Sequence, residues 1–122
     1  MPTAIIYVAS PKNRDFYAGL CQGVTDAICT VLNRPSHFVH AHVIESPCAN
    51  DFGNGNIVAE VFAHGGRSQE EQQAIGQKFI DSAVALGVSA DNIFCRFCDN
   101  PSGAILTQGV VRWAANDPRA PK

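Results

Sequence analysis

The chain has 122 residues, which is enough for one domain with a single hydrophobic core. Its formal net charge is −2 and it has no basic run, which excludes the basic surface that nucleic-acid-binding proteins use. No stretch is apolar and long enough to predict a membrane span, and the start lacks the basic residues of a secretory signal, so we expect a cytoplasmic protein. Five cysteines in such a chain predict free thiols, with no metal site.

Residues 2–9, with the sequence PTAIIYVA, predict a buried first strand. Two interpretations of Pro2 stay open at this point. A proline is tolerated at the first residue of a strand, where no ladder donor is needed. If Met1 is removed, however, Pro2 presents a secondary amine, and an α-amino group has an unperturbed pKa of about 7.7–8.0, so that it can act as a base or an acid near neutral pH.

The rest of the chain alternates helical and strand patterns. Ser10 as N-cap and Pro11 in the first turn predict the start of the first helix. Ser68 and Glu71 form a capping-box pattern that opens the second helix, and Gly87 is a natural stop. In chain order we predict a helix over 12–33, a strand over 38–45, a loop over 46–56, a strand over 57–63, a helix from the capping box to about 86, and a strand over 93–98.

The two halves of the chain repeat at an offset of 54 residues, as in the pairs Leu32/Leu86, Val39/Ile93, Glu45/Asp99, Pro47/Pro101 and Gly55/Gly109. Each half, about 2–55 and about 56–109, reads as a β-α-β unit, followed by a C-terminal tail within a single domain, 1–122. We therefore predict an α/β (α+β) fold: a four-stranded mixed sheet with both helices on one face.

This repeat has a consequence for Pro2. A pseudo-twofold axis between the units makes the first and third strands antiparallel neighbours, so that the start of one lies beside the end of the other. Pro2 is then expected near the turn that contains His64 and Arg67. The second face of the sheet stays uncovered, and its apolar residues predict an oligomer.

Together these features resemble the tautomerase superfamily, whose members carry an N-terminal catalytic proline on a β-α-β unit. The resemblance depends on Pro2, the 7–8 strand, residues 25–27, residues 37–38, residues 66–68, and Pro101 with Gly109. Within the superfamily the chain is most similar to the cis-3-chloroacrylic acid dehalogenase-like group. The resemblance implies a tautomerase/MIF-like fold, a homotrimer, and catalysis without a metal or organic cofactor.

The resemblance also assigns site residues. Pro2 matches the catalytic proline, and Arg67 matches an arginine that binds the substrate carboxylate, as its bidentate guanidinium suits. His64 stands where the dehalogenase has a second arginine, and Arg96, near the position of its tyrosine, is a candidate second cation. Ile28 and Thr107 stand where the dehalogenase has a histidine and a water-activating glutamate.

Three functional hypotheses follow. The first is a tautomerase in which Pro2 moves a proton on a 2-hydroxydienoate or an enolpyruvate held by Arg67. The second is a dehalogenase-like or hydratase-like reaction with protonated Pro2 as acid, which Ile28 and Thr107 disfavour because the general base is missing. The third is a trimeric binding module that has lost the chemistry.

Overall fold

The computed structural model describes residues 2–9, 12–46, 57–64, 67–100, 105–107 and 109–112. In chain order its helices and strands are β1 (Thr3–Val8), α1 (Arg14–Leu32), β2 (His40–Glu45), β3 (Ile57–His64), α2 (Gln69–Ala85), β4 (Ile93–Asn100), β5 (Ile105–Thr107) and β6 (Val110–Arg112). Two short 3-10 helices, η1 (Ser36–Phe38) and η2 (Ala90–Asn92), lead into β2 and β4.

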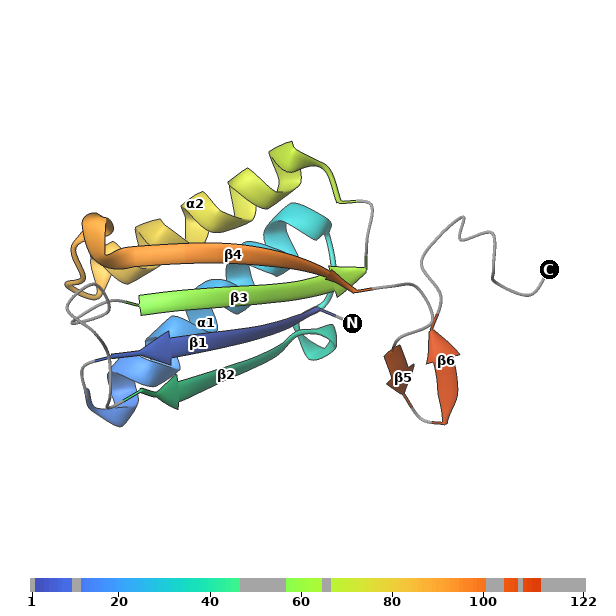
Figure 1. The fold of residues 1–122 in the computed structure, drawn as a ribbon, viewed down its shortest axis with the longest axis horizontal. Helices are drawn as coiled ribbons and strands as arrows, with labels where there is room; N and C mark the ends of the chain where they lie inside the picture. The colour runs from blue at the N-terminus through green and yellow to red at the C-terminus, as the bar shows by residue number, and fades with distance from the viewer. Residues whose placement is uncertain are drawn as a thin grey trace.

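The four long strands form one sheet in the order β2-β1-β3-β4. The pairs β1–β2 and β3–β4 are parallel, and the central pair β1–β3 is antiparallel. Both helices lie on the same face of this sheet (Figure 1). The two β-α-β units, the mixed sheet and the one-sided helices confirm the predicted fold class.

The core lies between the sheet and the helices. Alternate side chains of β1 enter it, because a strand directs successive side chains to opposite faces: Ala4, Ile6 and Val8 are buried, and their neighbours are half-buried. The helices contribute side chains at spacings of three and four residues, which place them on one face. These core residues are Leu20, Val24, Ala27 and Ile28 of α1 and Ile75, Phe79 and Ala83 of α2.

The two helices approach each other closely where α1 carries glycine. A Cβ atom on Gly19 would lie 2.9 Å from Cδ1 of Leu86, and one on Gly23 would lie 2.8 Å from Cβ of Ser82. Both distances are shorter than carbon atoms tolerate. The spacing of four residues between the glycines puts them on one side of α1, so that this side can lie against α2.

Two elements begin two residues later than predicted. The first helix begins at Arg14 rather than residue 12, because Asn13 is its N-cap and accepts a hydrogen bond from Phe16 N at 2.8 Å. The predicted cap, Ser10 with Pro11, lies outside the described residues. The second strand begins at His40, because the stretch predicted to start it first forms the 3-10 helix η1, whose Phe38 N donates to Pro35 O at 3.1 Å.

Around α2 the sequence prediction is confirmed. Ser68 is the N-cap, and its side chain and that of Glu71 bond to each other's backbone N–H as a full capping box. After the helix ends, Gly87 has a φ of 98°, which is the left-handed region that glycine adopts without strain. The strand β4 continues to Asn100, two residues beyond its predicted end.

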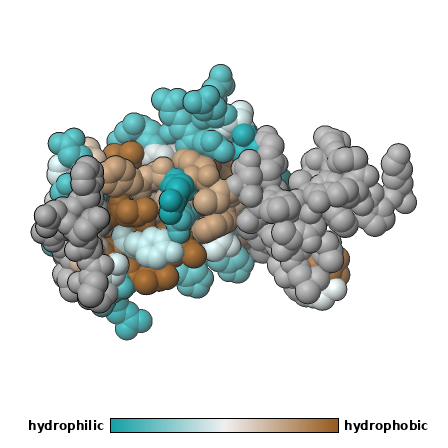
Figure 2. All heavy atoms as spheres, in the orientation of Figure 1, coloured by the Kyte–Doolittle hydropathy of each residue, from teal (hydrophilic) through white to brown (hydrophobic). Residues whose placement is uncertain are grey.

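The sheet face opposite the helices, hereafter the open face, is largely apolar with a hydrophilic group near its middle (Figure 2). On this face, Ile44 is 45% exposed and Phe94 is 48% exposed. His40 and His42 share it, as their alternation with Ala41 and Val43 predicts.

The hairpin of β5 and β6 stands beside the end of the sheet at which β3 and β4 finish (Figure 1). None of the described helices is long and apolar enough to cross a membrane.

Candidate functional site

Pro2 is buried and precedes the first residue of β1. The sheet holds it in place from two sides. Its carbonyl oxygen accepts a hydrogen bond from His40 N of β2 at 3.1 Å, and the next residue, Thr3, pairs with Phe62 of β3. Continued by one step, this antiparallel register sets Pro2 beside Ala63, at the end of β3 from which the chain leads toward Arg67.

A small cavity of about 10 Å³ lies at this point. It is bounded by the start of β1, the last turns of α1, the ends of β3 and β4, and the first two turns of α2. Its lining residues are Pro2, Ile28, Leu32, Val61, Ala63, Arg67, Gln72, Ile75, Phe97 and Cys98. Pro2 and Arg67, which sequence reasoning placed near each other, therefore meet in one cavity with predominantly apolar walls.

Arg67 is positioned by the start of α2, because it directly precedes the N-cap Ser68. Its Nε is buried and has no hydrogen-bond partner among the described residues. A buried donor without a partner costs about 1–3 kcal/mol, and more when the group is charged. The guanidinium thus presents unused donor capacity beside Pro2, and a carboxylate has the geometry to accept from it.

The other predicted site residues fall in different places. Ile28 lines the cavity, so the position at which the dehalogenase group has a histidine does face Pro2, but here it is aliphatic. His64 ends β3 opposite Asn100 of β4, and its side chain is outside the described part of the structure. The side chain of Thr107, in β5, is likewise outside it.

Arg96 is not among the residues that line the cavity. It forms an ion pair with Glu60 across the β3–β4 register, and the Glu60 side chain is only 14% exposed. Tyr7 joins them on the open face: a hydrogen bond to Glu60, together with desolvation and the negative charge of that carboxylate, raises the pKa of Tyr7. Arg96 therefore belongs to a polar group on the open face (Tyr7, Glu60 and Arg96).

Among the lining residues with a polar or thiol group, sequence reasoning missed two. Gln72 stands four residues after the helix cap Ser68, which sets it on the side of α2 above the cavity. From the sequence alone, a glutamine at this point of the helical pattern looks like a solvent-exposed residue. Cys98 pairs with Phe62 of β3, and only the strand register reveals this proximity to Pro2. The thiol of Cys95, three residues earlier, is different, because burial raises its pKa to about 11.

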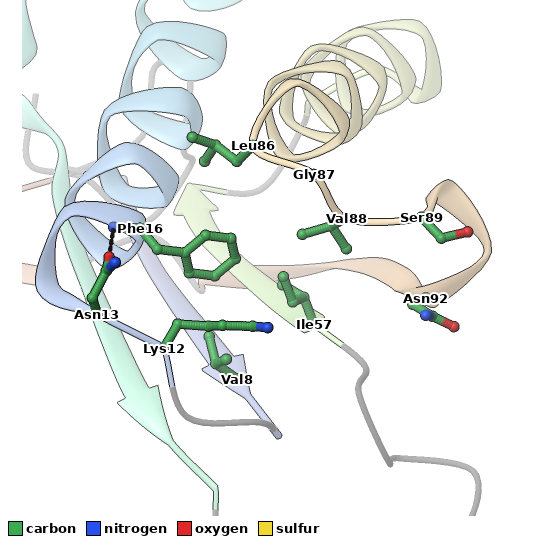
Figure 3. A pocket seen from close by; sticks show the side chains of 10 residues that line it. All are labelled: Val8, Lys12, Asn13, Phe16, Ile57, Leu86, Gly87, Val88, Ser89 and Asn92. Atoms are coloured by element: carbon green, nitrogen blue, oxygen red, sulfur yellow. Dashed lines mark hydrogen bonds between the residues drawn. The ribbon is translucent and has the colours of Figure 1, made fainter.

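A larger hollow of about 330 Å³ lies at the opposite end of β1, and the strand between Pro2 and Val8 is about 20 Å long. Lys12, just before α1, and Phe16 in its first turn face Ile57 and Val88 across it (Figure 3). It contains none of the predicted site residues. Among the residues that the structure describes, no three His, Cys, Asp or Glu side chains are grouped so as to hold a metal ion.

No family model matches the sequence, and no curated protein matches it. Solved structures do match. A fused 4-OT wild-type asymmetric trimer has a TM-score of 0.78 at 17% identity, covering 89% of this chain and 94% of that one. The malonate semialdehyde decarboxylase FG41 inhibited by 3-bromopropiolate has a TM-score of 0.71 at 22% identity, covering 83% and 85%.

The macrophage migration inhibitory factor of Toxoplasma gondii gives a TM-score of 0.71 at 15% identity, covering 87% of this chain and 96% of that one. All three proteins are members of the tautomerase superfamily, and each is covered over most of its length. The chain therefore has the fold of the tautomerase superfamily.

Proposed function

We propose that this protein is a cofactor-independent tautomerase that uses Pro2 as general base and acid on an unsaturated 2-hydroxy acid. The observation that carries the proposal is the cavity in which Pro2 meets Arg67, whose buried Nε has no partner in the described part of the chain. The shared fold supports it, because the proteins of similar structure are tautomerase-superfamily enzymes, one of them inhibited by the small carboxylate 3-bromopropiolate.

The chemistry requires that Met1 be removed, so that Pro2 carries a secondary amine. In neutral form this amine accepts the proton of the enol hydroxyl, and the electron pair of that O–H bond becomes part of a dienolate. The prolinium then returns the proton to carbon, which yields the 2-oxo acid and restores the amine. Apolar walls lower the pKa of an amine by desolvation, and thereby favour the neutral form.

Arg67 binds the substrate carboxylate and stabilises the charge that develops on the adjacent oxygen. The aliphatic Ile28 in the cavity favours this reaction over hydration, since it supplies no polar group to activate water. Within the superfamily we place the chain with the cis-3-chloroacrylic acid dehalogenase-like group, as a relative in sequence pattern rather than in activity.

We also propose a homotrimer, which would cover the apolar open face. The fused 4-OT of similar fold is described as a trimer. Apolar faces of this kind in oligomers are covered by another copy of the chain.

The test is ketonisation of phenylenolpyruvate and 2-hydroxymuconate, followed by ultraviolet absorbance on protein whose intact mass shows that Met1 is absent. We expect turnover of at least one of the two acids above the buffer rate. Pro2→Ala should lower kcat by 100-fold or more, since it replaces the secondary amine. Arg67→Ala should lower kcat/KM by 10- to 100-fold, and Lys78→Ala, an exposed cation on α2, should leave both unchanged. Equal turnover by the wild type and Pro2→Ala would disprove the proposal.

A further inference from the structure

The cavity at Pro2 is too small to hold a substrate. Its volume of about 10 Å³ is roughly the space that one water molecule needs, whereas ligand pockets usually measure about 300–1,000 Å³. An acid bound to Arg67 must therefore extend beyond the cavity. The residues that line the cavity show where such an extension could lie.

Two of these walls, Gln72 and Phe97, also line a second hollow on their other side. This is an open groove of about 370 Å³ between α2 and β4, hereafter the α2–β4 groove. Two side chains thus separate the cavity from a space of substrate size. Gln72 is half-buried on the first turns of α2, and its side chain can change rotamer without backbone movement, so it is the wall through which an opening would lead to the groove.

The groove is polar but uncharged. Its α2 side consists of glutamines at one helical face, and its floor is apolar. The glutamines are Gln69, Gln72, Gln73 and Gln77, and the floor is formed by Gly76, Ile80, Cys95 and Phe97. From Gln69 to Gln77 the helix rises by about 12 Å, which is enough for an extended chain of six or more carbons.

Among the hydrogen bonds of the described residues, one joins a charged side chain to this lining, and that charge is negative. Asp81, one turn beyond the groove, accepts a hydrogen bond from Nε2 of Gln77 at 2.9 Å. No Lys, Arg or His is among the described lining residues. A second carboxylate in the groove would lose hydration without gaining a cation, whereas glutamine amides can satisfy carbonyl and hydroxyl groups.

We infer that the α2–β4 groove selects elongated monocarboxylates: the carboxylate binds Arg67 beside Pro2, and the uncharged tail lies along the glutamines of α2. This inference rests on the proposed function and narrows it. The substrate is a 2-hydroxy enol acid with a neutral tail, and the corresponding dicarboxylates are disfavoured.

The test measures binding rather than turnover. Sorbate and trans,trans-muconate are six-carbon dienoic acids that differ in a terminal methyl group and a terminal carboxylate, and neither can tautomerise by the proposed route. Titration calorimetry at pH 7 should give a Kd for sorbate at least 10-fold below that for muconate. Arg67→Ala should weaken sorbate binding by 10-fold or more, because the anchor is removed.

A charge placed in the groove should reverse the preference. Gln73 is exposed on the groove side of α2, and Gln73→Lys keeps a good helix former while adding a cation. We expect muconate to bind Gln73→Lys at least 10-fold more tightly than the wild type, with sorbate little changed. Gln22→Lys is the matched control, since it makes the same charge change on the exposed side of α1.

The outcomes separate the inference from the proposed function. Absence of sorbate binding, equal affinity for the two acids, or the same response in Gln73→Lys and Gln22→Lys would overturn the groove as the selective site. Loss of the proposed function would show as equal turnover by the wild type and Pro2→Ala, and the binding preference would survive it, because the Pro2 amine takes no part in holding the tail.

Discussion

The polar group on the open face shows how single residues depend on strand register. Glu60 pairs with Arg96 of β4 and raises the pKa of Tyr7 of β1, so this partly buried carboxylate acts on residues of both strands that flank β3. The hydrogen bond is the first cause of the raised pKa of Tyr7, and the phenol consequently stays neutral to higher pH than an isolated tyrosine.

Glu60→Gln should therefore lower the pKa of Tyr7. The substitution removes the negative charge that opposes ionisation and leaves the cation of Arg96 nearby, which favours tyrosinate. In a Tyr17→Phe background Tyr7 is the sole tyrosine, because the chain contains two, and its ionisation can be followed by absorbance at about 295 nm as pH rises. The Tyr17→Phe parent is the control, and an unchanged or higher midpoint would contradict the assignment.

For single residues, the sequence could predict one contact between two side chains but not another. The proximity of Pro2 and Arg67 follows from the repeat, since two related β-α-β units bring the start of β1 to the end of β3. The partner of Arg96 could not be predicted in this way. It depends on the residue-by-residue alignment of β3 with β4, and a shift of one position would send the side chain to the other face.

Among the elements, the contact between the helices depends on two glycines of α1. At Gly23 an added methyl group would overlap Ser82 of α2, and overpacking of this kind costs about 1–3 kcal/mol. Alanine is favoured over glycine inside a helix by about 1 kcal/mol, which offsets part of that cost.

Gly23→Ala should lower the free energy of unfolding by up to about 2 kcal/mol, measured by urea denaturation followed by circular dichroism. Gly76→Ala is the matched control on α2. Its Cβ would lie 3.8 Å from Cβ of Cys95 and from the Phe97 ring, which are ordinary contacts, so we expect it to be neutral or stabilising. The double variant Gly23→Ala/Ser82→Gly should recover part of the loss. A Gly23→Ala protein as stable as Gly76→Ala would disprove the close contact.

Element boundaries show why sequence patterns locate helices better than their ends. Ser10 and Asn13 are both good N-caps, and local preference alone does not choose between them. The choice of Asn13 is consistent with tertiary contacts in the same turn: Lys12 N donates to the hydroxyl of Tyr17 at 2.8 Å, and this hydroxyl donates to Glu45 of β2 at 2.7 Å. Where one capping pattern had no competitor, as at Ser68, the prediction was confirmed.

At the scale of the whole molecule, the proposed trimer predicts different effects for substitutions on the open face and on the helical side. Phe94 on β4 and Val84 on α2 are almost equally exposed, at 48% and 45%. Only Phe94 belongs to the apolar open face that we propose is covered in a trimer. The pair therefore separates burial between subunits from the general effect of removing an exposed apolar side chain.

Wild-type protein should sediment with about three times the chain mass of 13.0 kDa in analytical ultracentrifugation. Phe94→Lys should shift the protein toward the monomer, because it places an unpaired cation in an apolar interface. Val84→Lys should sediment as the wild type. A monomeric wild type, or a Phe94→Lys protein with unchanged mass, would exclude the open face as the interface.

The order of the four long strands was predictable from the repeat, whereas the covering of the open face by another subunit stays a prediction. The single domain over 1–122 stays a prediction. The α2–β4 groove was not predictable, because glutamines at helical spacing resemble any solvated helix face, and their role depends on how α2 lies over β4.

The position of Pro2 also has a consequence for biosynthesis. Pro2 is buried, and its carbonyl is hydrogen-bonded to β2, so the residue that would supply the catalytic amine is at the same time part of the folded sheet. A peptidase needs an accessible, extended substrate, which Pro2 offers on the nascent chain and no longer offers once β1 has paired. On the proposed function, Met1 would then have to be removed before β1 pairs, and a molecule that folds with Met1 in place would lack the amine that the proposal requires.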